Sequence, residues 1–340
     1  MELLQNKSKK SVRIIDSRYG ESNMEDNRNF KLYTPVVFCT FNRLDTTKRV
    51  FEKIKEARPP KLYLISDCAR ISKPGEDDKV AAVRAYIEAS VDWPCEIRKN
   101  YAQENMGCGR RISSGLSWVF EQEEQAIILE DDCVPDPTFF RYCQEMLEYY
   151  KDDDRIMMIS GNNPMSGCYR VKGEYFFSKV PFVWGWATWK RAWDLYDFDL
   201  KSWPTARKDP KWHKVFPLRA YWVYMSEFDA LYRHTFNIWG YQLMYAIIYQ
   251  DKLAVAPSDS HVFNIGFDEE ATNTKKGFKW IRQDIVPVRF PIAHIHTVEW
   301  NRDFDRFYMK KLNKHGIIVK MKDILGIDIN RSIFEWMKRK

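Results

Sequence analysis

The chain contains 340 residues, of which 45% are hydrophobic and 30% are charged. This length and composition allow one large domain or two small ones, and they exclude disulfide-stapled miniproteins, intrinsically disordered chains and fibrous proteins. No apolar run approaches the 18 or so residues that a membrane helix needs. The sequence therefore indicates a globular protein without a membrane-spanning helix.

The formal net charge is +7, and residues 301–340 contribute most of it, with 11 basic and 5 acidic side chains. The rest of the chain carries no basic stripe, so we expect no nucleic-acid partner. Residues 313–340 form a basic C-terminal extension that also carries Ile333, Phe334, Trp336 and Met337. Such a segment is typical of peripheral contact with an anionic membrane surface, or of a solvated terminal helix.

The N-terminus and the cysteines bear on the cellular compartment. The first residues place their charges after a short apolar patch, which is not typical of a secretory signal. The seven cysteines are odd in number and contain no C-x-x-C pair, which favours reduced thiols over disulfides or a zinc site. We expect a cytoplasmic protein that can lie at the inner face of the membrane.

The elements predicted along the first half alternate regularly. Residues 1–31 are polar and lack apolar periodicity, which indicates an N-terminal arm. Strands are predicted at 32–39, 61–66, 95–99, 126–129 and 155–160, and helices at 43–58, 76–90, 110–122 and 137–150. Five strands separated by four helices predict an α/β fold with a Rossmann-like, doubly wound and mostly parallel sheet over 32–160.

The second half, 161–312, is dense in aromatic residues and has no clear strand–helix rhythm. We expect it to form a different layer that abuts the first half. The loop-rich stretch 160–210 is the expected junction, and small-molecule sites favour such junctions.

Polar residues follow every predicted strand of the first half. They are Thr40, Asn42, Arg43, Ser66, Asp67, Asn100, Glu130, Asp131, Asp132, Gly161 and Asn162. Each has an ordinary interpretation as a turn or helix-cap residue. In an open parallel sheet, however, ligands bind beyond the carboxyl ends of the strands, so these residues would meet in one crevice.

The most specific motif is AIILEDDCVPDP, in which four apolar residues are followed by three carboxylates. Alternate strand residues point in opposite directions, so Glu130 and Asp132 would share one side and Asp131 would take the other. Hard oxygen ligands suit Mg²⁺ or Mn²⁺, which need few protein carboxylates when a diphosphate supplies further oxygens. The motif therefore indicates a metal-assisted nucleotide-diphosphate site, and a solvated acidic turn is the alternative.

Other phosphate-binding motifs are absent or incomplete. The sequence has no G-x-x-x-x-G-K-[ST], and GCGRRI lacks the third glycine of a dinucleotide fingerprint. Arg110 and Arg111 open the helix after NMGCG, where a helix N-terminus and two guanidinium groups could hold phosphate.

The segments PVVFCTFNR, LISDCAR, NMGCGRR and ILEDDCVPDPTFF together resemble glycosyltransferases with the GT-A fold. The resemblance is to a bacterial family-2-like group that is also similar to N-acetylglucosaminyltransferase I. It continues in VWGWATWKRAW and SHVFNIGFDEEATNT, and so covers roughly 34–300.

The resemblance implies roles for the strand-end residues. Thr40, Asn42, Arg43 and Asp67 would hold the nucleoside of a nucleotide-diphosphosugar, a UDP-sugar in our interpretation. Glu130, Asp131 and Asp132 would face the ribose, the diphosphate and a divalent ion, with Asp132 as the direct ligand. Residues 32–160 would then bind the donor, and residues 161–312 would bind a glycan, lipid-linked or protein acceptor and carry the catalytic groups.

The catalytic base is the weakest part of this resemblance. Related sequences often read W-D-Y-Q, whereas this chain reads Trp239, Gly240, Tyr241, Gln242, so one aspartate is missing. Substitute candidates are Glu270, Glu269 and Asp229, together with Glu227 and Asp268. Each of these is also compatible with an ordinary surface carboxylate.

Two histidines and several aromatic residues complete the candidate site. His294 and His296 alternate like strand residues, so one could reach the metal, or both could be structural. Trp184 and Trp186 flank Gly185 in a predicted loop and are candidates for a sugar-stacking wall. Trp239 and Gln242 are added to that wall as candidates.

Three functions remain open from sequence. The favoured one is a glycosyltransferase. A non-catalytic sugar-nucleotide or glycan-binding subunit is the alternative that the missing aspartate suggests. A metal-dependent phosphohydrolase would need a nucleophile or a second metal cluster, and the sequence offers neither.

Overall fold

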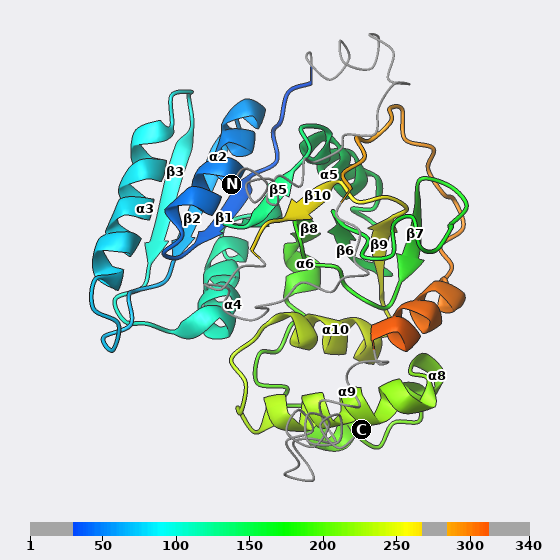
Figure 1. Ribbon diagram of the computed structural model, residues 1–340. Helices are drawn as coiled ribbons and strands as arrows, with labels where there is room; N and C mark the ends of the chain where they lie inside the picture. The colour runs from blue at the N-terminus through cyan, green and yellow to red at the C-terminus, as the bar shows by residue number, and fades with distance from the viewer. Residues whose placement is uncertain (1–29, 267–283, 313–340) are drawn as a thin grey trace, which may run out of the picture.

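The computed structural model describes residues 30–266 and 284–312, and strands and helices alternate through its first half (Figure 1). The named elements are β1 (Val36–Thr40), α2 (Leu44–Ala57), β2 (Lys61–Ser66), α3 (Glu76–Ser90), β3 (Glu96–Tyr101), α4 (Gly107–Phe120), β4 (Gln125–Glu130), β5 (Cys133–Pro135), α5 (Thr138–Tyr149), β6 (Ile156–Ser160), β7 (Tyr175–Ser178), β8 (Trp186–Trp189), α6 (Lys190–Trp193), α7 (Trp203–Ala206), α8 (Lys211–Val215), α9 (Leu218–Tyr232), α10 (Gly240–Tyr249), β9 (Leu253–Pro257) and β10 (Val262–Asn264). Residues 302–312 are also helical.

The predicted α/β fold is confirmed, and all five strands and four helices of the first half form within a few residues of their predicted ends. Helix α2 illustrates why the sequence determines them. Its inward residues Val50, Phe51 and Ile54 recur at helical spacing and are fully buried. The helix ends where Arg58 adopts a left-handed conformation and Pro59 follows.

The main sheet has eight strands in the order β3-β2-β1-β4-β8-β6-β9-β7. Strands β3, β2, β1 and β4 are parallel, whereas β8 runs antiparallel between β4 and β6. Strand β9 pairs parallel with β6, and β7 pairs antiparallel with β9. The expectation that the second half forms a different layer is corrected in part. Three of its strands, β7, β8 and β9, belong to the same sheet as the first half.

The inserted strand β8 was not expected because WATW carries no regular alternation of apolar and polar residues. All four of its residues are buried, since both faces of the strand are covered by other elements. Its Trp186 stacks on Trp239, with 5.4 Å between ring centroids, on one side of the sheet. Its Trp189 donates to the carbonyl of Leu147 in α5 on the other side.

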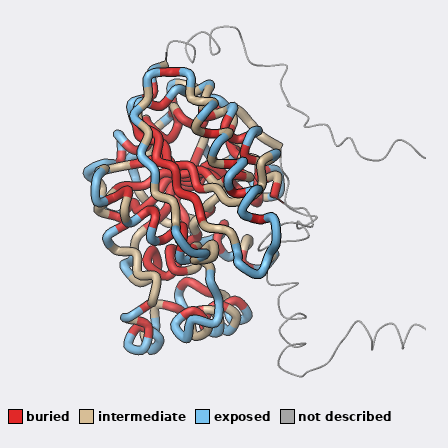
Figure 2. The backbone as a smooth tube through the Cα atoms, turned by 90° about the vertical axis from the view of Figure 1, so that its left-hand side faces the viewer, coloured by how far each residue is buried: buried red, intermediate tan, exposed pale blue. Residues whose placement is uncertain are grey.

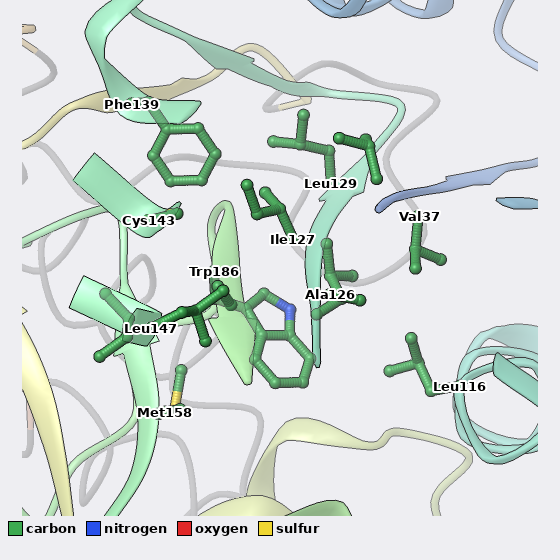
Figure 3. Packing of buried hydrophobic residues seen from close by; sticks show 14 of the residues in the cluster. Val37, Leu116, Ala126, Ile127, Leu129, Phe139, Cys143, Leu147, Met158 and Trp186 are labelled. Carbon is green, nitrogen blue, oxygen red and sulfur yellow. The ribbon is translucent and has the colours of Figure 1, made fainter. Parts of the chain in front are cut away.

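Helices cover both faces of the sheet, and the strands between them form the core (Figures 1 and 2). On one face, Phe38 packs on Phe51 of α2, with 6.1 Å between ring centroids. Close to β4, Ile127 lies on the side of α5, whereas Leu116 of α4 lies on the side of Val37 (Figure 3). This packing holds the carboxyl ends of β1 and β4 side by side.

A second apolar cluster joins α7, α8, α9 and α10 below the sheet (Figure 1). Its centre is made of fully buried aromatic rings. They are Trp203, Trp212 and Phe228, with Tyr245 packed against them. That this part of residues 161–312 binds an acceptor stays a prediction.

In the part of the chain that the structure describes, no helix combines the length and apolarity required to cross a bilayer. The predicted N-terminal arm lies almost wholly outside the described residues, and the basic extension 313–340 lies wholly outside them.

Buried Asp305 ties the last described helix to β7. Its carboxylate accepts hydrogen bonds from the Ser178 hydroxyl, the Lys179 backbone N–H and Trp300 Nε1, at 2.5–2.8 Å. Asp305→Ala removes the acceptor of three donors, of which only the Ser178 hydroxyl has another acceptor, the Val180 carbonyl. We therefore expect the free energy of unfolding to fall by about 2–4 kcal/mol in urea titrations. Asp303→Ala, at an exposed position of the same helix, is the control and should change it by less than about 0.5 kcal/mol.

Candidate functional site

The order of the strands places a switch point between β1 and β4. After β1 the chain moves to β2 and β3 on one side, and α4 then carries it back to β4 on the other side. Ligands of open α/β sheets bind at the carboxyl ends of the strands at such a point. A cavity of about 300 Å³ lies there.

The cavity is lined by the ends of β1, β2 and β4, the start of α4, and residues near β8 and β10. Its lining residues are Cys39, Thr40, Phe41, Arg43, Ile65, Asp67, Arg70, Asn105, Gly107, Cys108, Arg111, Ile112, Glu130, Asp131, Asp132, Trp184, Asn264 and Gly266. Eight of the residues predicted from sequence therefore meet in one cavity. The structure does not place Asn42 or Arg110 among them.

Arg43 is the charge partner of the acidic triplet. Its Nη2 contacts Asp131 Oδ1 at 2.5 Å and Asp132 Oδ2 at 2.8 Å. The backbone N–H of Phe41 also donates to Asp131. Burial opposes the charge of Arg43, but Asp131 and Asp132 raise its pKa above the ordinary value, so the guanidinium stays protonated.

Two carboxyl groups of the cavity, those of Glu130 and Asp131, are harder to ionise than a solvated carboxyl group. Burial raises the pKa of Glu130, and the neighbouring Asp132 and Asp131 raise it further. Burial also raises the pKa of Asp131, although Arg43 opposes that shift. One arginine thus faces three acidic groups, and a further cation would relieve their mutual repulsion.

Asp132 is positioned by residues at and just after the end of β10. Asn264 Nδ2 donates to its Oδ1 at 3.2 Å, and the Asn264 side-chain oxygen accepts from the N–H of Gly266. A Cβ on Gly266 would overlap the Asp132 carboxylate and would lie 2.9 Å from Arg43 Nη1. Glycine at this position therefore lets Asp132 and Arg43 meet.

The carboxylates of the cavity could hold a divalent cation only if a bound phosphate-bearing molecule supplied further oxygen atoms. Within residues 30–266 and 284–312, no three His, Cys, Asp or Glu side chains form a group that could hold a metal ion by themselves. Magnesium-type sites that rely on one or two carboxylates take their remaining oxygens from substrate phosphates and water. Asp132 at a cavity mouth, beside Asp131, matches that kind of site.

Asp67 already has hydrogen-bond donors for both of its carboxylate oxygens. Oδ1 accepts from the N–H groups of Cys68 and Met106, at 2.9 and 3.0 Å, and Oδ2 accepts from Gly107 N–H and Asn105 Nδ2, at 2.8 and 3.2 Å. Asp67 therefore fixes the loop that leads into α4. Its predicted contact with a nucleoside stays a prediction.

Asn237 already accepts hydrogen bonds from backbone N–H groups at the start of α4. This corrects the expectation that Arg110 and the N-terminus of this helix bind phosphate. The N–H of Gly109 donates to the Asn237 carbonyl, and the N–H of Arg110 donates to Asn237 Oδ1. A Cβ on Gly109 would lie 2.6 Å from the Asn237 backbone, so the close approach requires glycine. The Arg110 guanidinium lies over the Phe198 ring instead.

Arg111 lies inside the cavity wall and is only 5% exposed. Its Nη2 donates to the side-chain and backbone oxygens of Asn100, and its Nη1 donates to Ser114. Its Nε is buried and has no hydrogen-bond partner. Burial lowers its pKa, so an anionic or carbonyl-bearing ligand would stabilise the guanidinium.

Glu76 organises the cavity rim, and the sequence analysis missed it. Its carboxylate accepts from Asn42 Nδ2 at 2.9 Å and binds the guanidinium of Arg70. Arg70 lines the cavity, whereas Asn42 does not. Asn42 therefore helps to position Arg70 indirectly, through their shared partner Glu76. Glu76 opens a helix far from any strand end, where no sequence pattern separates it from an ordinary first-turn acid.

Of the four candidates for a sugar-stacking wall, only Trp184 lines the cavity. Trp186 and Trp239 are 1% and 4% exposed and stack on each other in the core. Gln242 is buried in α10 and donates to the Ile238 carbonyl. These three are corrected to packing residues, because Trp186 belongs to the buried sheet strand β8 and Trp239 and Gln242 are buried at the start of α10.

The other candidates lie elsewhere. Asp229 accepts from Trp203 Nε1 and pairs with Arg207 within the helical cluster. His294 stacks on the Tyr149 ring, and His296 Nδ1 is hydrogen-bonded to the Tyr149 hydroxyl. Tyr149 is the last residue of α5, so both histidines lie at the end of that helix farthest from Asp132. This corrects the expected catalytic role of Asp229 and the expected metal role of both histidines. Glu269, Glu270 and Asp268 lie outside the described residues.

Comparisons with known proteins give structural likeness only. No protein-family model matches the sequence, and no curated protein sequence matches it. The chain is similar to the mannosyltransferase PcManGT from Pyrobaculum calidifontis in complex with GDP-Man and Mn²⁺, at 13% identity and a TM-score of 0.32, over 47% of this chain and 45% of that one.

Two further solved structures show a comparable likeness. One is TarS of S. aureus, at 10% identity and a TM-score of 0.29, over 42% of this chain and 24% of that one. The other is an apo UDP-glucose pyrophosphorylase, at 11% identity and a TM-score of 0.31, over 67% of this chain and 93% of that one. This chain thus spans less than half the length of PcManGT and of TarS.

The ion pair of Glu76 predicts a pH effect on stability. Arg70 lowers the pKa of Glu76 to about 2, from an ordinary value of 4.5. A depressed pKa stabilises the fold above the unfolded value, and this contribution is lost as pH falls from 4.5 towards 2. Since Arg70 is partly exposed, we expect about 1–2 kcal/mol.

Urea titrations at pH 7, 4.5 and 3 test this expectation. Glu76→Gln should be less stable than the unmodified protein at pH 7, and the difference should shrink at pH 3. Glu56→Gln, at an exposed ion pair of α2, is the matched control and should show little difference at any pH. A Glu76→Gln deficit that is equal at all three pH values would contradict the ionic role.

Proposed function

We propose that the protein is a glycosyltransferase and that the cavity between β1 and β4 binds its nucleotide-diphosphosugar donor. The observation that supports this most is the meeting of Arg43, Asp131 and Asp132 at the switch point of the sheet. A phosphate-bearing ligand needs cations and hydrogen-bond donors, whereas a divalent ion needs carboxylates. Both sets are present on one cavity wall.

The residues that line the cavity fall into two chemical groups, and we assign each group to a different part of the donor. Thr40, Asp67 and Arg111 lie with apolar Ile65 and Ile112 and suit a nucleoside, whose base has both apolar faces and polar edges. The orphan Nε of Arg111 would gain an acceptor there.

We assign the second group to the diphosphate and the sugar. Asp131, Asp132 and Arg43 would surround the charged bridge between nucleoside and sugar. The ring of Trp184 lines the same cavity and offers a face for the sugar C–H groups.

Arg43 and Asp132 are the residues that would respond to the donor. Arg43 is held between two carboxylates, and a diphosphate would offer it a second anionic partner. Asp132, with Asp131 beside it, would then be the protein ligand of Mn²⁺ or Mg²⁺. The bound cation would neutralise negative charge on the departing diphosphate.

The acceptor and the base are part of the proposal. Within the described residues, the carboxyl groups that line the cavity are Asp67, Glu130, Asp131 and Asp132, all from the ends of β2 and β4. We do not assign the base to any of them, since Asp67 already accepts four hydrogen bonds and Asp131 and Asp132 contact Arg43, with Glu130 next to them in the chain. Glu269 and Glu270 therefore remain the proposed base candidates, for a glycan, lipid-linked or protein acceptor.

The missing base supports a second candidate function. Gly240 stands where related sequences carry an aspartate, so a binding subunit that holds a sugar nucleotide without transferring the sugar is the alternative. The two functions agree on the cavity and differ in turnover. Slow release of free sugar from a bound donor distinguishes a transferase from a binding subunit.

Calorimetric titration of UDP, GDP and their sugar derivatives, with and without Mn²⁺, tests the donor site. We expect Mn²⁺ to tighten binding, and Asp132→Asn to weaken the Mn²⁺-dependent binding at least tenfold, about 1.4 kcal/mol. Asp152→Asn, at an exposed position before β6, is the control and should bind normally. Absence of binding by every nucleotide would refute both functions.

Gly266→Ala tests how closely Asp132 and Arg43 must approach. The new methyl group displaces the free end of a side chain and not the backbone, so the fold should remain intact. We expect the thermal midpoint to change by less than a few degrees and the affinity for the nucleotide diphosphate to fall about tenfold. Gly75→Ala is the contrasting control, because its Cβ would meet no atom but the backbone there has a positive φ. This substitution should lower the free energy of unfolding and leave the affinity for the nucleotide diphosphate unchanged.

A further inference from the structure

Two large apolar side chains stand out of the surface of α9. Leu218 is 74% exposed and Trp222 is 66% exposed. They are four residues apart, so they lie on the same side of the helix, one turn from each other. The opposite side of α9 is buried in the helical cluster, and so the exposed pair is not needed for packing.

Basic side chains surround this pair. Arg219 and Lys214 are exposed beside it in α9 and α8. An aromatic contact joins the two helices there, because His213 of α8 stacks on Tyr221 of α9 at 4.0 Å. Within α9, Tyr221 meets Trp222 edge-on at 5.2 Å. We call Lys214, Leu218, Arg219 and Trp222 the α8–α9 patch.

The surrounding helical region is also positive. Between residues 201 and 235 the sequence has seven basic and three acidic side chains. Two of the acids, Asp209 and Asp229, are paired with Lys211 and Arg207. An apolar pair inside a basic field is the surface expected for an anionic interface.

We propose that the α8–α9 patch docks the protein on an anionic phospholipid surface. Trp222 and Leu218 would enter the interfacial region, where tryptophan is favoured, and Lys214 and Arg219 would face the lipid phosphates. A second copy related by a two-fold axis would bring equal charges together. The basic segment 313–340 would be repelled in the same way, and so neither fits this patch as well.

The patch belongs to the layer that borders the cavity. Asn237 lies in the connection from α9 to α10 and accepts hydrogen bonds from two backbone N–H groups at the start of α4. Its Nδ2 donates to the Met106 carbonyl. Docking through α9 would fix the orientation of the cavity rim relative to the membrane, which would suit a lipid-linked acceptor. This last consequence rests on the proposed function, whereas the membrane binding itself does not.

Co-sedimentation of the full chain with vesicles tests the proposal. We expect binding to vesicles of phosphatidylcholine with 30% phosphatidylglycerol, weakening as salt rises, and little binding to pure phosphatidylcholine. The double variant L218A/W222A should reduce the partition coefficient at least tenfold, and K214E/R219E should do the same. All four side chains are exposed, so the circular dichroism spectrum and the thermal midpoint of both double variants should match those of the unmodified protein.

Matched variants outside the patch serve as controls. Ile71→Ala removes a fully exposed apolar side chain, and Lys53→Glu reverses a charge on α2. Both should bind vesicles like the unmodified protein. Nucleotide titration of L218A/W222A should also be unchanged, so failure of the membrane proposal is distinguishable from failure of the donor site.

Three results would overturn the proposal. One is the absence of binding to anionic vesicles. Another is unchanged binding by L218A/W222A, which would assign attachment to a different part of the chain. The third is a dimer in light scattering that the same variants dissociate, since the patch would then join two copies.

Discussion

The candidate site depends on the contact between Arg43 and the carboxylates of Asp131 and Asp132. Without a cation, the close acidic groups at the end of β4 would repel one another in a poorly solvated place. Arg43 comes from the loop after β1, so the contact also fixes the distance between two strand ends. Under the proposed function, a metal ion and a diphosphate would share the carboxylates and the guanidinium of this contact.

The inserted strand β8 explains how the second half supports this site. By pairing with β4 and β6, it brings the Trp184 segment to the mouth of the cavity. Strand β10 pairs with β5 directly after the acidic triplet, and so Asn264 and Gly266 reach Asp132. The cavity is therefore shared by both halves of the chain, although its charged groups come from the first.

The helical layer of α7–α10 has two sides with different chemistry. Its inner side is a cluster of interlocked aromatic rings that stiffens the connection to the sheet. Its outer side leaves Leu218 and Trp222 in water among basic residues, which has an energetic cost unless another surface covers them. Asn237 links this layer to the start of α4, so the orientation of the patch and of the cavity are fixed together.

The sequence by itself determined the strands and helices of the first half and the residues at their carboxyl ends. These features follow from local periodicity and from the rule that parallel strands end at one edge. Only the tertiary structure decided that β8 enters the sheet, that Trp186 is core, and that His294 and His296 lie away from Asp132. It also revealed Glu76 and Asn264. Most of these outcomes depend on contacts between residues far apart in the sequence, such as Asn264 with Asp132 and β8 with β4, which no local pattern encodes.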